Sequence, residues 1–183
     1  MGIIDEIRIR SGKISLRREL NNQRSRKVVA TNLNDATSVA LLLKIKDEKD
    51  YKKVTKFMKY LKEEFGIKRV FFLGYWDDAK NDPDFLQSKL DFDFFTKKDL
   101  NWKGIPIGGT IDNFTSEKFD ILIDLNNYFN VPLRYLILKS ASKLKVGRYN
   151  KENEAYFDLM LSNDQDDFEM YCNQLVKYLT MIH

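Results

Sequence analysis

Charged side chains stand directly after several apolar segments of this sequence, at positions where they could do chemistry. Asp77 and Lys46 each follow such a segment, and Asp124 lies near the end of another. Carboxylates in a cleft can hold Mg²⁺ or act as general acid and base, so these three residues are the catalytic candidates. Such acids also serve as helix caps and turn formers, and this structural role stays the alternative.

Four further residues are candidates for ligand binding. Asn126 and Asn127 follow the same apolar segment as Asp124, and Arg148 could donate hydrogen bonds to a phosphate group. Trp76 stands after an aromatic segment, where it either presents a binding surface or packs over the edge of a sheet.

Several common chemistries are excluded by the residue types present. The sequence has one histidine, His183, at its last position, and one cysteine, Cys172, on the apolar stripe of a predicted helix. Histidine general bases, Ser–His or Cys–His pairs and metal sites built on them are therefore not expected. The turn after the first apolar segment reads KIKDEKD without glycine, and no Walker A pattern occurs, so NAD, FAD and P-loop nucleotide binding are not expected either. We predict no metal site and no cofactor.

Apolar segments and helical patterns alternate along the chain from residue 37 onward. Residues 37–44 and 69–75 are continuous apolar runs, typical of strands covered on both faces. Between them, residues 48–65 carry an apolar stripe at helical spacing, with Asp47 placed to cap the helix and Gly66 to end it. Further strands are predicted over residues 91–96, 119–125, 144–147 and 156–161, and helices over 111–117, 131–141 and near the C-terminus.

This alternation predicts an α/β fold, a mostly parallel, doubly wound, Rossmann-like three-layer sheet of about six strands. We expect the strand order 3-2-1-4-5-6. Ligands of such sheets bind beyond the carboxyl ends of the strands where the order reverses, here between the first and fourth strands. The loops at that point are residues 44–47 and 124–127.

The N-terminal segment differs in charge from the rest of the chain. Residues 1–30 carry eight basic and three acidic side chains, interleaved with isoleucine and leucine. We predict a basic helical extension over residues 1–30, interrupted at Gly12, and a single Rossmann-like domain over residues 31–183. The apolar side of this helix is expected to dock on the domain or on a second copy, which would give a homo-oligomer. Binding to nucleic acid or to an anionic membrane surface ranks behind these.

No segment of the sequence reads as a targeting signal or a membrane span. The first residues lack the apolar run of a signal peptide, and no stretch reaches the length of a membrane-spanning helix. A single cysteine cannot form a disulfide within the chain. We therefore expect a cytoplasmic protein.

Three segments carry a resemblance to known proteins: Phe95–Gly104, which contains KKDLNW, Phe119–Leu125 and Ser142–Gly147. Together they resemble a family of uncharacterised bacterial proteins, from about residue 20 to the end, and the resemblance implies a class without an assigned activity. Residues 119–149 are also similar to the strand–helix–strand that closes the N-terminal Rossmann-like domain of heptosyltransferase-type glycosyltransferases. This second likeness supports the fold and not the activity, because the chain lacks their second domain and their Gly-Asp turn.

We interpret the chain as a binding or interaction protein without standard nucleotide-binding motifs, rather than as an enzyme. One alternative is a small enzyme that acts on a phosphorylated or sugar-like substrate at the carboxyl ends of the strands. The other is an adaptor that binds nucleic acid or a membrane surface through the basic N-terminal segment.

Overall fold

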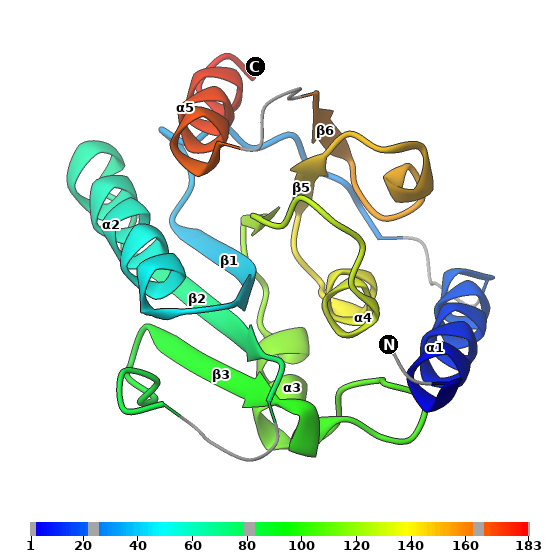
Figure 1. The fold of residues 1–183 in the computed structure, drawn as a ribbon. Coiled ribbons are helices and arrows are strands. Elements are labelled where there is room, and N and C mark those ends of the chain that lie inside the picture. The colour runs from blue at the N-terminus through cyan, green and yellow to red at the C-terminus, as the bar shows by residue number, and fades with distance from the viewer. Residues whose placement is uncertain (1–2, 22–25, 79–82, 163–166, 183) are drawn as a thin grey trace.

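The computed structural model describes residues 3–21, 26–78, 83–162 and 167–182. Within them, six parallel strands form one open sheet in the order β3-β2-β1-β4-β5-β6 (Figure 1). This confirms the predicted Rossmann-like α/β fold and its strand order. The strands are β1 (Ser38–Ile45), β2 (Arg69–Trp76), β3 (Phe92–Thr96), β4 (Ile121–Asp124), β5 (Leu144–Arg148) and β6 (Leu159–Leu161).

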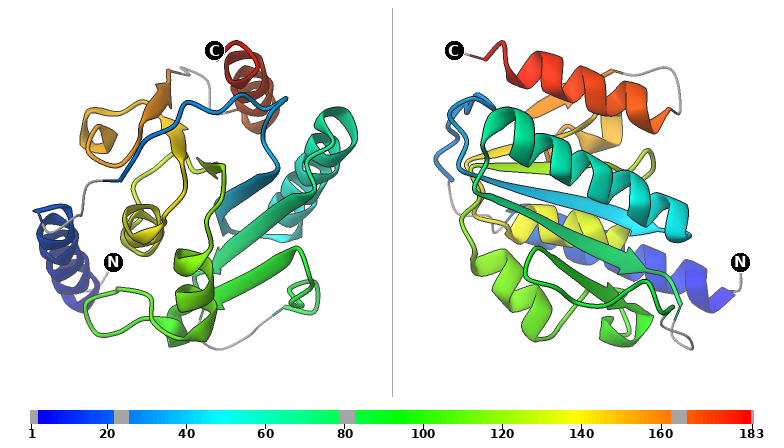
Figure 2. Two further views of the ribbon diagram at one scale, coloured as in Figure 1. Left: turned by 180° about the vertical axis from the view of Figure 1, so that it is seen from behind. Right: turned by 90° about the vertical axis from the view of Figure 1, so that its left-hand side faces the viewer.

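Helices cover both faces of the sheet and give the molecule its layers (Figures 1 and 2). Successive side chains of a strand point to opposite faces, so Val39 and Leu41 of β1 enter the core under α2 and α5. Ala40 and Leu42 enter the core under α3 and α4. The helices are α1 (Ile3–Asn21), α2 (Glu48–Phe65), α3 (Gly109–Ser116), α4 (Val131–Lys139) and α5 (Phe168–Leu179).

Helix α2 begins and ends where the sequence predicts. The Asp47 carboxylate accepts a hydrogen bond from the Asp50 amide at 2.9 Å, and Gly66 takes a left-handed conformation with φ 63° directly after the helix. Strand β6 is shorter than the predicted segment 156–161. The first residues of the predicted segment form a turn, and the Phe157 ring packs against Gly147. A Cβ at Gly147 would lie 2.5 Å from that ring.

Helix α1 runs unbroken through Gly12 and packs on α4, outside the layers of the sheet (Figure 1). A Cβ on Gly12 would lie 2.6 Å from Cγ1 of Val131 and 2.8 Å from the carbonyl oxygen of Lys103. Leu16, one turn further along, is completely buried in a cluster with Val131 and Leu138. Glycine therefore allows the close approach of α1 to α4, where the sequence pattern predicted an interruption.

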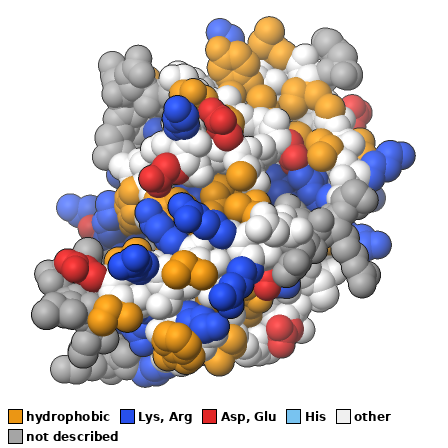
Figure 3. Space-filling view, turned by 90° about the vertical axis from the view of Figure 1, so that its right-hand side faces the viewer, with side chains coloured by type: hydrophobic (Ala, Val, Ile, Leu, Met, Phe, Trp, Pro, Cys, Tyr) orange, Lys and Arg blue, Asp and Glu red, His pale blue; other side chains and the backbone are white. Residues whose placement is uncertain are grey.

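The outer face of α1 is basic and partly apolar. Ile7 is 57% exposed and Ile14 is 46% exposed. Arg10, Lys13 and Arg17 lie around a hollow on the same face. Figure 3 views the side of the molecule on which α1 lies, and basic and hydrophobic patches adjoin one another on it.

Candidate functional site

A cleft of about 450 Å³ opens at the carboxyl ends of the strands, beside the reversal of strand order between β1 and β4. Lys44 comes from β1, Asp77 directly follows β2, and residues 128–132 form the end of the loop after β4 and the start of α4. Helix α1 adds Arg8 to the wall. The right-hand view of Figure 2 shows the strand arrowheads and the first turn of α1 at the same end of the molecule.

Basic side chains outnumber acidic ones in this cleft, which we call the basic cleft. Among its described lining residues, Asp77 is the one carboxylate. Tyr75, Tyr128 and Phe129 add aromatic surface. The four cationic side chains of the lining are those of Arg8, Lys44, Lys97 and Lys103.

Hydrogen-bonded turns after β3 hold two of these cations in place. The Asp99 carboxylate accepts a hydrogen bond from the Thr96 amide at 2.8 Å, and this capping box starts a short 3₁₀ turn that contains Lys97. The Asn101 side-chain oxygen then accepts hydrogen bonds from the amides of Lys103 at 2.9 Å and Ile105 at 3.1 Å. The segment is therefore fixed by its own polar side chains, and its lysines reach the cleft from a defined backbone.

Asp77 is held in its charged form by its neighbours. The Lys44 ammonium donates a hydrogen bond to it, the Lys97 ammonium lies 3.0 Å away, and the Tyr75 hydroxyl donates to it at 3.0 Å. Burial by itself raises the pKa of Asp77, but the hydrogen bonds from Lys44 and Lys97 outweigh burial and hold the pKa below its ordinary value. Asp77 is therefore an ionised anchor for two lysines and a weak base at neutral pH.

The two tyrosines of the cleft stay neutral at physiological pH. Burial, followed by the charge of Asp77, raises the pKa of Tyr75 well above its ordinary value. Burial, followed by the charge of Asp50, raises the pKa of Tyr128 to about 12. The Tyr128 hydroxyl can donate a hydrogen bond to a ligand, whereas the Tyr75 hydroxyl already donates its proton to Asp77. Neither hydroxyl gives up its proton readily near pH 7.

The amino end of α4 faces the same cleft. Asn130 caps this helix by accepting a hydrogen bond from the Leu133 amide at 3.2 Å, and Asn130, Val131 and Pro132 all line the wall. The positive end of the helix dipole adds to the charge of the four cationic side chains. The cleft is therefore suited to an anion rather than to a neutral or cationic ligand.

A second cavity of about 150 Å³ adjoins the basic cleft, and Lys44 and Tyr128 line both. We call it the side cavity. The Asn126 side-chain oxygen accepts a hydrogen bond from the Lys44 amide at 2.8 Å and so joins the loop after β4 to β1. The side cavity contains four residues that the sequence proposed for a site: Lys46, Asn126, Asn127 and Arg148.

Asp124, the remaining carboxylate candidate, lies beneath the two cavities and not in their lining. Only 1% of its side chain is exposed. Its carboxylate accepts hydrogen bonds from the Arg134 guanidinium and from the Asn126 amide group. The geometry gives Asp124 a structural role, as the buried partner of Arg134.

Trp76 and Cys172 both pack against the core. The Trp76 ring lies edge-on to Phe85, with 6.1 Å between ring centroids, beside the hydrophobic cluster under α2. Trp76 thus packs near the sheet edge, the second of the two roles that the sequence allowed. Cys172 is buried as predicted, and burial raises the pKa of its thiol to about 12, which makes it a poor nucleophile.

Sequence reasoning missed most of the basic cleft. Arg8, Tyr75, Lys97, Lys103 and Tyr128 were not proposed as site residues. The available signal was the segment Phe95–Gly104, which follows a predicted strand and so had to reach the edge of the sheet where ligands bind. For Arg8 no local signal exists, because its place depends on how α1 docks.

Fold and cleft together define a Rossmann-like α/β domain with a cleft lined by basic side chains beside the reversal of strand order. The chain belongs to the family described as "Family of unknown function (DUF6913)", whose model matches residues 8–182. No curated protein and no solved structure matches it, so the likeness to heptosyltransferases finds no support there. Among the described residues, no helix is long and apolar enough to cross a membrane, and no three acidic, histidine or cysteine side chains come together as metal ligands.

Proposed function

We propose that this protein binds a small phosphorylated compound in the basic cleft. The observation that carries the proposal is the lining, in which Arg8, Lys44, Lys97 and Lys103 face one described carboxylate. That carboxylate is itself engaged by two lysines, so the cleft keeps an excess of positive charge for a ligand. Lysine, arginine and a helix N-terminus are the groups that hold phosphate in proteins.

The size and the aromatic surface of the cleft support a small organic ligand. A volume of about 450 Å³ lies within the range of clefts that take metabolites and cofactors. Tyr75, Tyr128 and Phe129 offer apolar and hydrogen-bonding surface beside the cations. A location in the cytoplasm, which the sequence led us to expect, suits such a ligand and stays a prediction.

The pKa directions favour binding over proton-transfer catalysis. General acids and bases work best when their pKa lies near the working pH. The pKa of Asp77 is lowered by its lysine partners, and the pKa values of Tyr75 and Tyr128 are raised by burial. An enzyme acting on a phosphorylated substrate would need another group for this step, and so it ranks second.

Two further proposals concern helix α1: self-association, and an adaptor role toward nucleic acid or membrane. Ile7 and Ile14 are exposed beside basic side chains on the outer face of α1, a surface that could pair with a second copy. Gel filtration of the full chain tests the predicted homo-oligomer, which a purely monomeric elution would contradict. An adaptor role toward nucleic acid or membrane rests on charge alone and ranks behind self-association.

Titration calorimetry with glucose 6-phosphate, inorganic phosphate and glucose tests the proposed function. We expect the two phosphates to bind and glucose not to bind, because the charge is the feature recognised. Replacing both Lys97→Met and Lys103→Met should weaken glucose 6-phosphate binding by about tenfold or more, the equivalent of one charged hydrogen bond. Lys59→Met, at a side chain 73% exposed on α2, is the matched control and should bind as the original chain does. Equal binding by the double variant, or no binding of either phosphate, would refute the proposal.

A further inference from the structure

Arg148 is a cation without a hydrogen-bonding partner in the described part of the chain. Its guanidinium lies over the Tyr171 ring, with 3.9 Å between Cζ and the ring centroid. Its Nε is buried and makes no hydrogen bond there. A buried donor left unpaired is unfavourable, and a guanidinium offers five donors in a fixed plane that matches phosphate oxygens.

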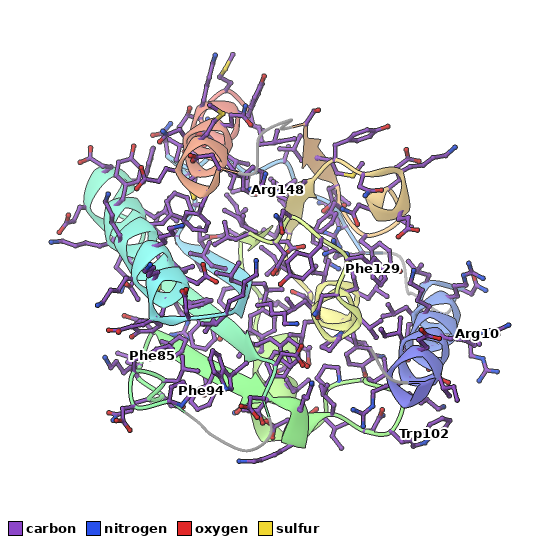
Figure 4. All side chains as sticks on the ribbon, viewed as in Figure 1. Arg10, Phe85, Phe94, Trp102, Phe129 and Arg148 are labelled. Atoms are coloured by element: carbon purple, nitrogen blue, oxygen red, sulfur yellow. The ribbon has the colours of Figure 1, made fainter. Side chains whose placement is uncertain are left out.

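The Arg148 guanidinium is held in position from below. The Tyr171 hydroxyl donates a hydrogen bond to the backbone oxygen of Asp124 at 3.3 Å, which fixes the ring on which the guanidinium rests. Tyr171 itself is completely buried. The Arg148 guanidinium therefore rests on a rigid platform at the carboxyl end of β5. Figure 4 labels this residue.

The side cavity around Arg148 is itself cationic. Lys46 and Lys53 line it with Arg148, and Asp50 is the carboxylate among its described lining residues. The Asp50 carboxylate accepts a hydrogen bond from the Lys46 amide at 3.1 Å, so it also serves the turn before α2. The Lys46 ammonium lies 5.4 Å from the centroid of the Tyr128 ring, on the wall between the two cavities.

The two cavities are neighbours at the carboxyl edge of the sheet, because two residues contribute to the lining of both. Lys44 and Tyr128 line the basic cleft on one side and the side cavity on the other. Each cavity has cations of its own. Those of the basic cleft come from α1 and from the segment after β3, and those of the side cavity come from β5 and from the start of α2. Figure 4 labels one residue of each cavity, Phe129 beside α4 for the basic cleft and Arg148 near β5 for the side cavity.

We infer that the ligand carries two phosphate-type groups, one bound in the basic cleft and the other by Arg148 in the side cavity, with the body of the ligand passing Lys44 and Tyr128. This rests on the proposed function and narrows it from phosphorylated compounds in general to bisphosphorylated ones. The side cavity, with its volume of about 150 Å³, is large enough for an anionic group and too small for a second complete metabolite.

A series of linear alkane bisphosphonates of increasing chain length, each paired with the alkyl monophosphonate of equal length, tests the inference. We expect every monophosphonate to bind weakly, and one chain length of bisphosphonate to bind at least about tenfold more tightly, because only that length reaches both cavities. Calorimetry measures both affinities on the full chain.

Arg148→Met identifies where the second group binds. Methionine keeps an unbranched side chain to pack on Tyr171 but removes all donors, so we expect the advantage of the bisphosphonate to disappear while monophosphonate affinity is unchanged. Arg148→Lys should restore part of the advantage. Arg18→Met, at an exposed position of α1 outside both cavities, is the matched control. If Arg148→Met fails to fold by thermal melting, the double variant Lys46→Met with Lys53→Met replaces it.

The outcomes separate this inference from the proposed function. Binding of monophosphonates without any gain for a bisphosphonate of any length would overturn the second subsite and leave the proposed function standing. A bisphosphonate gain that survives Arg148→Met would also overturn it, because the second group would then bind elsewhere. Absence of binding by every phosphonate, and by inorganic phosphate, would remove the proposed function itself.

Discussion

Asp124 and Arg134 form a buried ion pair under the cleft, and their chemistry is best understood as structural. Arg134 also donates to the Asn153 side chain at 3.0 Å and lies over the rings of Phe129 and Phe157. With both side chains almost completely buried, the removal of either charge leaves the other without compensation.

Asp124→Asn should therefore lower the free energy of unfolding by about 3 kcal/mol, as is typical when one partner of a buried pair is neutralised. Chemical denaturation measures this. Asp35→Asn, an exposed aspartate in the turn before β1, is the control and should change stability little. A melting temperature unchanged by Asp124→Asn would show that the pair does not stabilise the fold, and would return Asp124 to the list of cleft candidates.

Lys145 is a second buried charge, and its energetics depend on pH. It is 1% exposed, and its ammonium donates a hydrogen bond to the Leu138 carbonyl oxygen at 3.3 Å. Burial, followed by the nearby charge of Arg26, lowers the pKa of Lys145 to about 8. In the unfolded chain the lysine pKa is about 10.4, so below pH 8 folding buries a charge, and between pH 8 and 10.4 that cost is progressively relieved.

Lys145→Met should consequently stabilise the protein at pH 7, by on the order of 2 kcal/mol. The gain should shrink as the pH rises from 8 to above 10, because there the original lysine is neutral in the folded state. Denaturation of both proteins at pH 7, 9 and 10.5 gives the difference directly. A gain independent of pH would mean that folding does not lower the pKa of Lys145, because the folded and unfolded chains would then bind the same number of protons at every pH.

At the scale of elements, α1 completes the site, although it lies outside the three layers. Arg8 reaches the basic cleft because the helix passes close to α4 at Gly12, and the Arg8 side chain packs on Gly104 and donates to the Trp102 carbonyl oxygen at 3.4 Å. The family match begins at residue 8, within this helix. The family match therefore includes most of α1, which packs on α4.

Gly12→Ala should push α1 away from α4, since its Cβ would overlap Val131 and the Lys103 carbonyl oxygen. We expect a loss of about 1–3 kcal/mol in stability and weaker phosphate binding, because Arg8 is displaced. Gly109→Ala is the matched control: nothing lies within 4 Å of the added Cβ, so both stability and binding should be kept. Unchanged phosphate binding by a destabilised Gly12→Ala protein would show that Arg8 does not contribute.

Elements could be predicted more fully than the site, for a physical reason. Strands covered on both faces and a capped amphipathic helix leave local patterns, so β1, β2 and α2 were predicted nearly to the residue. Lys46, Asp77 and Arg148 were proposed because they stand at predicted strand ends, and the structure places each in the lining of one of the two cavities. Asp124 also stands at a strand end, but its side chain is buried against Arg134 of α4. That pairing depends on how α4 packs on the sheet, which the local sequence does not show. Arg8 and Lys103 depend on the contact at Gly12, which no local pattern reveals.

At the level of the whole molecule, the basic groups of the proposed phosphate site come from separate parts of the chain. A parallel sheet with a reversal of strand order brings β1, β2 and β4 to one edge, and α1 and the segment after β3 close the cleft from the side. Positive charge gathers in the basic cleft as well as on the outer face of α1, on a chain whose overall net charge is only +4. The central claim is that the basic cleft, and not the basic face of α1, binds phosphate.

Backbone amide NMR of the labelled protein, titrated with inorganic phosphate, tests this claim most directly. We expect saturable shifts that are largest for the amides of Lys44, Gly104 and Val131, which line the basic cleft. Shifts that cluster instead at Arg10, Lys13 and Arg17 on the outer face of α1, or that never saturate, would contradict it.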